Sequence, residues 1–246
     1  MQRNTLIYEW KICTKIMGGK MSFYQKWYEN LTNDKICQYY INEFLNGNKE
    51  AVNELENGDK GTLEICCKTL LSIPIEEFID CINTKKEYDI TDIVQFSDFE
   101  SAIIKTPAIL EIDKSELSFC DLGRTLINAK TVGACTKYGE NHAKLAKELS
   151  LVTVSKRPIY VKNTNFGTFT VYLDSSSRLE IIKRIALRNN FIYTLIFDAK
   201  QGKANYMKMA LTCLKKSTAE RRRSNVKYIV RLILQNNSLL HEIEWR

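Results

Sequence analysis

Apolar side chains recur at helical spacing along the first third of this chain. One such stripe consists of Ile36, Tyr40, Ile41, Phe44 and Leu45. Thr32 or Asn33 is suited to cap this helix, and Gly47 is suited to end it. Pro74 is typical of the first position of a further helix. The pattern therefore predicts a helical domain over residues 21–106.

The pattern changes after Pro107, which we take as a domain boundary. Helical spacing predicts three short helices, over residues 115–127, 131–138 and 139–149. Alternating polar and apolar positions between residues 151 and 172 then predict two strands, with Asn165 and Gly167 in the turn between them. Three helices followed by a hairpin is the order of a winged helix, and we predict one over residues 107–174.

The same design recurs in residues 175–246. Ser176 or Ser177 is suited to cap a first helix, while segment 190–197 fits a strand and a helix equally well. Two further helices and a tail strand are predicted over residues 203–214, 218–234 and 239–245. We therefore predict a second winged helix over residues 175–246. The predicted fold class is mainly α with small β-hairpin wings: a helical N-terminal domain plus two winged-helix domains.

Charge is distributed unevenly over this pattern. The chain has a net charge of +7, and residues 201–246 hold ten Lys/Arg against three Glu. Residues 21–110 are acidic instead, with 16 Asp/Glu against eight Lys/Arg. An acidic first part followed by a basic remainder indicates separate modules, of which the basic one faces a polyanion.

The most basic predicted helix, residues 218–234, also carries the clearest pattern. Val226, Ile229, Val230 and Ile233 define its apolar face, and Arg221, Ser224, Asn225 and Tyr228 lie roughly opposite. We expect Ser217 or Thr218 to cap it. Arg pairs with guanine and Asn with adenine through two hydrogen bonds each, so this face carries both types of base-reading side chain. Double-stranded DNA is the expected partner; a solvated basic face, and a helix that pairs with the acidic domain, are the alternatives.

The candidate DNA contacts come from both predicted modules. We expect base contacts from Asn141, Lys144, Arg221, Arg222 and Asn225. We expect backbone contacts from Lys137, His142, Arg157, Lys215, Lys216, Arg223 and Lys227, and Thr218 and Tyr228 complete the set. Backbone contacts would position the protein, whereas base contacts would give it sequence preference.

Two stretches resemble known DNA-recognition modules. The segments Cys120–Arg124, Thr136–Ala146 and Leu149–Val152 resemble a bacterial winged-helix module of restriction systems and related regulators. Ser217–Arg223, with Val226–Leu234 behind it, is similar to the second winged helix that often follows. The resemblance covers residues 111–246, and implies sequence-preferring DNA binding in a restriction–modification system or by a transcription regulator. Such modules often carry an aromatic residue, commonly Trp, on the last helix, where this chain has Tyr228 or Ile229.

A nuclease is the enzymatic alternative. An apolar segment ends in Asp198-Ala199-Lys200, and Asp174 precedes it. Restriction nucleases of the PD-(D/E)xK class hold a divalent metal with two carboxylates and use a lysine beside the attacking water. Asp174 lacks the usual preceding proline, so we expect no catalytic residue, and the pattern predicts neither a cofactor nor a metal site.

Other features limit location and partners. The eight cysteines lack zinc-site spacing and lie mostly among apolar residues, which is typical of reduced thiols in a cytoplasmic protein. No apolar run is long enough to cross a membrane. Met21 follows Met17-Gly18-Gly19-Lys20, which would result from in-frame translation of a ribosome-binding site, so we expect residues 1–20 to be an upstream extension. The acidic residues 21–106 offer a docking surface for a protein partner or another copy, which leaves a protein-docking adaptor as a further alternative.

Overall fold

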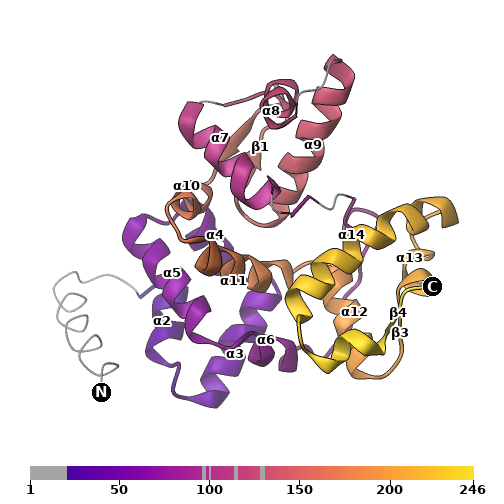
Figure 1. Ribbon diagram of the computed structural model, residues 1–246. Helices are drawn as coiled ribbons and strands as arrows, with labels where there is room; N and C mark the ends of the chain where they lie inside the picture. The colour runs from indigo at the N-terminus through magenta and orange to yellow at the C-terminus, as the bar shows by residue number, and fades with distance from the viewer. Residues whose placement is uncertain (1–20, 96–97, 100, 114–115, 128–130) are drawn as a thin grey trace.

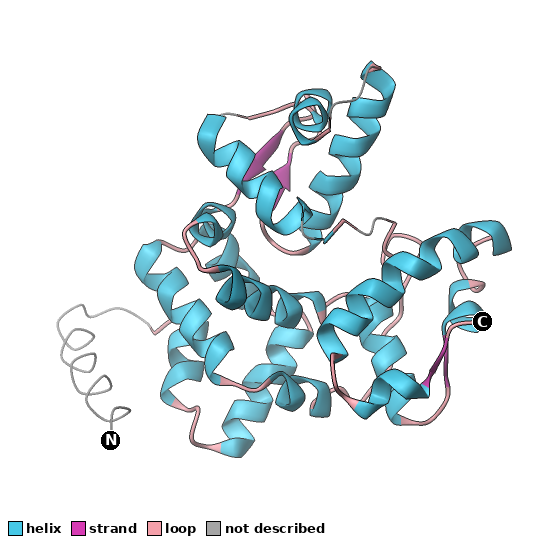
Figure 2. Ribbon diagram, viewed as in Figure 1, coloured by secondary structure: helices cyan, strands magenta, loops and turns pink. Residues whose placement is uncertain are grey.

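The computed structural model describes residues 21–246 except 96–97, 100, 114–115 and 128–130. The expected upstream extension, residues 1–20, lies outside these described residues. The described chain is mainly helical with two small strand pairs, as Figure 2 shows, and this agrees with the predicted mainly α class. Figure 1 shows the elements in three groups, which we call the N-terminal unit (α2 to α6), the middle unit (η1 to β2) and the C-terminal unit (α12 to β4).

The N-terminal unit is a bundle of short helices around an aromatic core. Its helices are α2 (Phe23–Glu29), α3 (Asp34–Leu45), α4 (Lys49–Asn57), α5 (Lys60–Ser72) and α6 (Ile75–Asp80). Trp27 is fully buried, and its ring centroid lies 5.9 Å from that of Phe44 and 6.0 Å from that of Phe78. The carboxylate of Glu54 accepts hydrogen bonds from the first amides of α2, at 2.7 Å from Phe23 N and 3.1 Å from Tyr24 N. An acidic residue of this unit is thus part of its internal structure.

The middle unit places a short π-helix and three α-helices before a two-stranded hairpin. Its elements are η1 (Ser101–Lys105), α7 (Thr106–Asp113), α8 (Phe119–Leu126), α9 (Val132–Glu148), β1 (Val152–Val154) and β2 (Val161–Asn163). The strands pair antiparallel, with Val154 opposite Val161. Leu117, between α7 and α8, adds a third extended segment, because its backbone exchanges two hydrogen bonds with Val161. Val161 therefore lies between Leu117 on one side and Val154 on the other.

Two central helices connect the middle and C-terminal units. They are α10 (Asn165–Val171) and α11 (Ser175–Ala186). Helix α10 packs against α4, α5 and α7, and α11 packs against α5 and α14. The C-terminal unit consists of α12 (Asn190–Lys200), β3 (Ala204–Asn205), α13 (Tyr206–Ala210), α14 (Lys216–Leu234), η2 (Ser238–Glu242) and β4 (Ile243–Glu244). Strands β3 and β4 pair in parallel over two residues each. Within the described part of the chain, no helix is both long and apolar enough to cross a membrane.

The predicted hairpin turn is wrong. Residues 155–160 form the turn, and the predicted turn residues Asn165 and Gly167 lie in α10. Thr164 caps this helix through a hydrogen bond from Gly167 N to its hydroxyl, at 2.9 Å. A Cβ on Gly167 would lie 1.9 Å from the carbonyl oxygen of Leu151, so glycine here allows close packing rather than a reverse turn.

The two predicted helices 131–138 and 139–149 are one helix, α9. Gly139 does not interrupt it, because this glycine lets α9 approach α8. A Cβ at Gly139 would lie 2.0 Å from the carbonyl oxygen of Phe119, and one at Gly123 would lie 1.9 Å from that of Cys135. The two glycines therefore face the same helix contact from opposite sides.

The chain from residue 174 onward corrects four further expectations. Segment 203–214 is not one helix, because it contains β3 and the short α13. Asp174 rather than Ser176 or Ser177 caps α11, and α14 begins after Lys215, whose side chain makes no capping hydrogen bond. The basic helix itself follows the prediction closely, since α14 spans Lys216–Leu234. The tail forms η2 and β4 instead of one longer strand.

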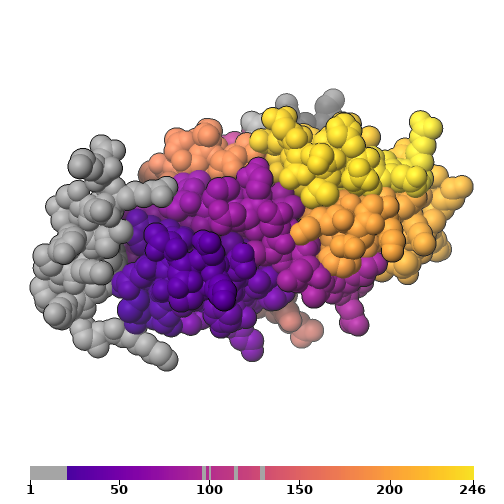
Figure 3. Space-filling model, turned by 90° about the horizontal axis from the view of Figure 1, so that it is seen from below, coloured from indigo at the N-terminus to yellow at the C-terminus, as the bar shows by residue number. Residues whose placement is uncertain are grey.

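Long cationic side chains tie the units together at carbonyl groups. Arg184 of α11 donates to Ile73 O at the end of α5, at 2.7 Å through Nη2. Lys200 of α12 donates to the carbonyls of Ile79, Asp80 and Ile82 at the end of α6, at 2.8–3.0 Å. Helix C-termini leave carbonyls without partners and carry partial negative charge, so cations are favourable there. The N-terminal and C-terminal units consequently adjoin each other, as Figure 3 shows.

Replacing Arg184 tests this cation–carbonyl contact. We expect Arg184→Met to lower the free energy of unfolding by about 3 kcal/mol, because it leaves a buried carbonyl without its charged donor. Urea denaturation measures the change. Arg231→Met on the exposed side of α14 is the control, and should change the free energy by less than about 0.5 kcal/mol. Equal losses in both variants would contradict a specific role for Arg184.

A matched pair of glycine variants tests the packing of α8 and α9. Gly139→Ala should lower the free energy of unfolding by about 2 kcal/mol, because the new Cβ meets the Phe119 carbonyl oxygen. Gly133→Ala, in the same helix, meets nothing within 4 Å and should raise it by about 0.5–1 kcal/mol through helix propensity. Thermal and urea denaturation measure both changes in the free energy of unfolding. Stabilisation by both changes would show that α9 does not need the close approach.

Candidate nucleic-acid interface

Helix α14 exposes most of the predicted base-reading face. Its packed side is formed by Ala219, Val226, Ile229, Val230 and Ile233, which are all buried. Arg221, Ser224 and Tyr228 recur every three or four residues on the opposite side and are exposed, with Tyr228 at 46%. Asn225 lies beside them and is half-buried. A guanidinium, an amide, a hydroxyl and a phenol therefore face solvent from one helix.

Arg222 is not part of this face, so its predicted role in base contact is wrong. Its side chain is only 6% exposed, and Nη1 donates to Ile90 O at 2.9 Å and to Ile93 O at 2.8 Å. Burial lowers its pKa, and the neighbouring charge of Arg221 adds to this. The physical reason is helical geometry, because residue 222 lies four positions before Val226 and shares its packed side.

The beginning of α14 combines exposed cations with an end that lacks a side-chain cap. Lys215 and Lys216 are exposed, and Thr218 is half-buried. The helix begins at Lys216, so the predicted caps Ser217 and Thr218 lie inside it. The cap position is occupied by Lys215, whose side chain makes no capping hydrogen bond. Free amides and positive charge at a helix N-terminus favour anions such as phosphate.

The other two predicted backbone contacts of α14 have partners in the C-terminal tail. Lys227 Nζ lies 5.5 Å from the centroid of the Trp245 ring, and Arg223 Nη1 donates to Trp245 O at 3.5 Å. The Trp245 ring stacks on Tyr206, whose hydroxyl donates to Ala219 O at 2.8 Å. Both cations are half-buried and retain partial contact with solvent. Trp245 thus supports the side of α14 next to the base-reading face.

Helix α9 presents a second polar face around one acidic residue. Lys137 and Lys144 are exposed, and both pair with Glu140, at 3.0 Å and 2.6 Å. Hydrogen bonds from Lys144 and Lys137 lower the pKa of Glu140. Asn141 is half-buried, and it lines a hollow of about 400 Å³ with Lys144, Lys147, Thr91, Val94 and Gln95 among others. The acidic residue reduces the net charge of this face.

His142 is buried, so its predicted contact with the DNA backbone is wrong. The imidazole is 0% exposed, and its Nδ1 lies 2.9 Å from Tyr138 O. Nε2 lies 3.8 Å from the Asp98 carboxylate. Burial lowers the pKa of His142, although the hydrogen bond with Tyr138 and the charge of Asp98 oppose this. The neighbouring positions Ala143 and Ala146 are also buried, which places His142 on the core side of α9.

The hairpin turn carries a third set of exposed cations. Residues 155–160 are all exposed, including Lys156 and Arg157. Ser155 holds the turn together, because its Oγ accepts from Tyr160 N at 2.8 Å and donates to Pro158 O. Arg157 therefore extends from a constrained turn between β1 and β2.

The residues of the nuclease alternative have structural partners. Asp174 accepts from Ser177 N at 2.9 Å as the cap of α11. Asp198 pairs with Lys85 at 2.8 Å, and Lys200 is bound by three carbonyls. Asp198 and Lys200 lie in a helix rather than at the end of a strand. Across the described residues, no group of three or more His, Cys, Asp or Glu side chains suits a metal ion.

One exposed cation belongs to the α14 face although it was not predicted. Arg231 follows Tyr228 by three positions on α14. Helical spacing alone would have identified it. No family model, curated protein or solved structure matches the chain. The resemblance to tandem winged-helix modules therefore stays a prediction.

The burial of His142 predicts a loss of stability in weak acid. A histidine whose pKa is lowered by folding binds its proton more readily in the unfolded chain, so stability should fall as pH decreases below about 6.5. One proton contributes at most about 1.4 kcal/mol per pH unit. His142→Phe should reduce this slope in urea denaturation between pH 7.5 and 5. An unchanged slope would show that other groups account for the acid sensitivity.

Proposed function

We propose that the chain binds double-stranded DNA with sequence preference, either as the recognition part of a restriction–modification system or as a transcription regulator. The exposed face of α14 is the observation that carries this proposal. Arg221 and Asn225 supply the two side-chain types that pair with guanine and adenine, and Tyr228 lies next to them. A helix of this length fits the major groove, which is about 12 Å wide.

The order of elements in the middle unit supports a winged-helix interpretation. Helices α7, α8 and α9 precede β1 and β2, and Leu117 adds the extended segment between the first two helices. In a winged helix the third helix enters the major groove and the hairpin turn contacts the backbone. Asn141 and Lys144 of α9 would then face bases, while Lys137 and Arg157 would contact phosphates.

The C-terminal unit supports a second binding element. The short α13 packs on α14 through a turn, as in a helix-turn-helix in which the second helix reads DNA. The parallel pair of β3 and β4 replaces the predicted two-stranded wing. Lys215, Lys216 and Arg223 would contact phosphates around α14, together with Lys227 and Thr218.

The alternative of an internal ion pair is weaker. In the part of the chain that the structure describes, no carboxylate lies within salt-bridge distance of Arg221, Lys215 or Lys216. The acidic N-terminal unit therefore does not neutralise the exposed end of α14. Positive charge that is left without internal partners favours a polyanion.

Arg221→Ala is the decisive variant for this function. A site is first selected from a random DNA pool with the full chain, and binding is then measured on that site and on random DNA. Arg221→Ala should weaken binding to the selected site by about 1–3 kcal/mol and change random binding little. Lys216→Ala should weaken both equally, because it removes a phosphate contact. Affinity should also fall with salt, by about 0.9 log units per log unit of salt for each neutralised phosphate.

Matched controls separate DNA binding by α14 from nonspecific charge attraction and from the two alternative functions. Lys35→Ala removes an exposed lysine of the N-terminal unit and should leave both affinities unchanged. A flat salt response, or equal losses in Lys35→Ala and Arg221→Ala, would refute DNA binding by α14. Cleavage of plasmid with Mg²⁺ that is lost in Asp198→Ala would favour the nuclease alternative instead. A stable protein complex that survives nuclease treatment would favour a docking adaptor.

A further inference from the structure

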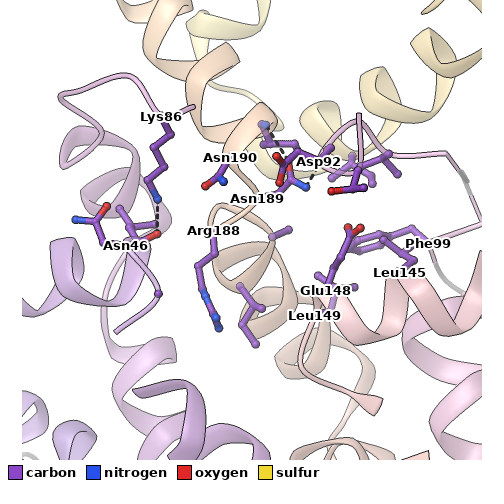
Figure 4. A pocket seen from close by; sticks show the side chains of 18 residues that line it. Asn46, Lys86, Asp92, Phe99, Leu145, Glu148, Leu149, Arg188, Asn189 and Asn190 are labelled. Atoms are coloured by element: carbon purple, nitrogen blue, oxygen red, sulfur yellow. Dashed lines mark hydrogen bonds between the residues drawn. The ribbon is translucent and has the colours of Figure 1, made fainter. Parts of the chain in front are cut away.

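A cavity of about 360 Å³ lies where the three units meet (Figure 4). The connecting segment (residues 81–95), the end of α3, the end of α9 and the turn between α11 and α12 contribute to its lining. Ile229 adds a contact from α14. The volume is within the range of small-molecule sites, which are commonly found between domains. This site is separate from the proposed DNA-binding faces and does not depend on them.

One side of the cavity carries two cations. Arg188 lies in the turn between α11 and α12, with its guanidinium carbon 5.6 Å from the centroid of the Phe44 ring. Its Nε and Nη1 are buried and have no hydrogen-bond partner among the described residues. Lys86 lies on the same side, where Nζ donates to Leu45 O and lies 4.0 Å from the centroid of the Tyr193 ring. Burial lowers the pKa of Lys86 to about 8, and the charge of Arg188 adds to this.

The opposite side carries two carboxyl groups. Asp92 comes from the connecting segment and Glu148 from the last turn of α9, and Figure 4 shows both across the cavity from Lys86 and Arg188. Glu148 remains open to solvent within the cavity. Burial by the surrounding protein raises the pKa of Glu148 to about 8, and the charge of Asp92 adds to this. A neighbouring cation would favour the ionised form of Glu148.

The two sides do not neutralise each other. Among the described residues, none of these four groups takes part in a salt bridge. Each side therefore holds two ionisable groups of the same type, and two buried nitrogens of the Arg188 guanidinium have no hydrogen-bond acceptor. A buried cation without an acceptor is unfavourable, and an anionic group of a ligand would supply the acceptor. A singly charged ligand would satisfy only one side of the cavity.

We propose that this cavity binds a small zwitterionic molecule, with its anionic group at Arg188 and Lys86 and its ammonium group at Glu148 and Asp92. The connection between the sides is already fixed, because Asn189 Nδ2 donates to Asp92 O at 2.9 Å. This contact holds the connecting segment to the turn that carries Arg188. The occupant would contact elements of all three units and stabilise their arrangement.

A series of ω-amino acids tests the proposal without knowledge of the natural ligand. The full chain is titrated at pH 8 with each member from glycine to 6-aminohexanoate, and with carboxylates and amines of matched chain length. One chain length should raise the melting temperature most, because its two charges match the separation of the two sides. The singly charged analogues should bind at least tenfold more weakly. The absence of a shift throughout the series, or equal shifts with a carboxylate alone, would overturn the proposal.

The variants distinguish a ligand site from a structural group. Glu148→Gln and Arg188→Met should each weaken binding of the best ω-amino acid at least tenfold. Arg188→Met should leave the melting temperature of the ligand-free chain unchanged or raise it, because it removes a buried guanidinium that lacks an acceptor. Glu64→Gln, on the exposed side of α5, should keep wild-type binding. Arg188→Met with a lower ligand-free melting temperature and unchanged binding would identify Arg188 as structural and refute the site.

Discussion

Hydrogen bonds from buried cations to carbonyl oxygens determine how this chain is assembled. Arg184 and Lys200 donate to carbonyl groups at the ends of α5 and α6, and Arg222 donates to the carbonyls of residues 90 and 93. Donor and acceptor are separated by 111 to 132 residues along the chain in these contacts. The helix ends of the N-terminal unit thus depend on side chains that are synthesised much later. Arg184, Lys200 and Arg222 are therefore needed inside the fold before any external partner is considered.

The internal use of cations also sharpens the functional inference. Net charge alone would assign all basic residues of the C-terminal part to a polyanion, although Arg178, Lys183, Arg184 and Arg222 are buried. The cations left over are concentrated on α14, on α9 and in the hairpin turn 155–160. These are three separate elements rather than a uniform surface. A distribution of this kind supports recognition by specific elements better than nonspecific attraction.

Periodicity identified the parts of the fold that depend on local pattern. α14 has an apolar stripe, and the sequence predicted its extent to within two residues. The single helix α9 and the short α10 were missed, because Gly139 and Gly167 serve close contacts with distant backbone. The burial of Arg222 follows from its spacing with Val226, but its carbonyl partners lie in a segment without regular structure. The cavity could not be predicted, because it combines residues from five separate parts of the chain.

The connecting segment relates the two candidate recognition helices to each other. Arg222 of α14 binds it at residues 90 and 93, Asn189 binds it at Asp92, and Tyr138 of α9 donates to Asp98 just beyond it. Hydrogen bonds from both α9 and α14 therefore reach this part of the chain. Two helices that read one duplex must keep a fixed spacing. A molecule bound beside Asp92 would contact this part of the chain, so the proposed ligand would be placed to influence the proposed DNA binding.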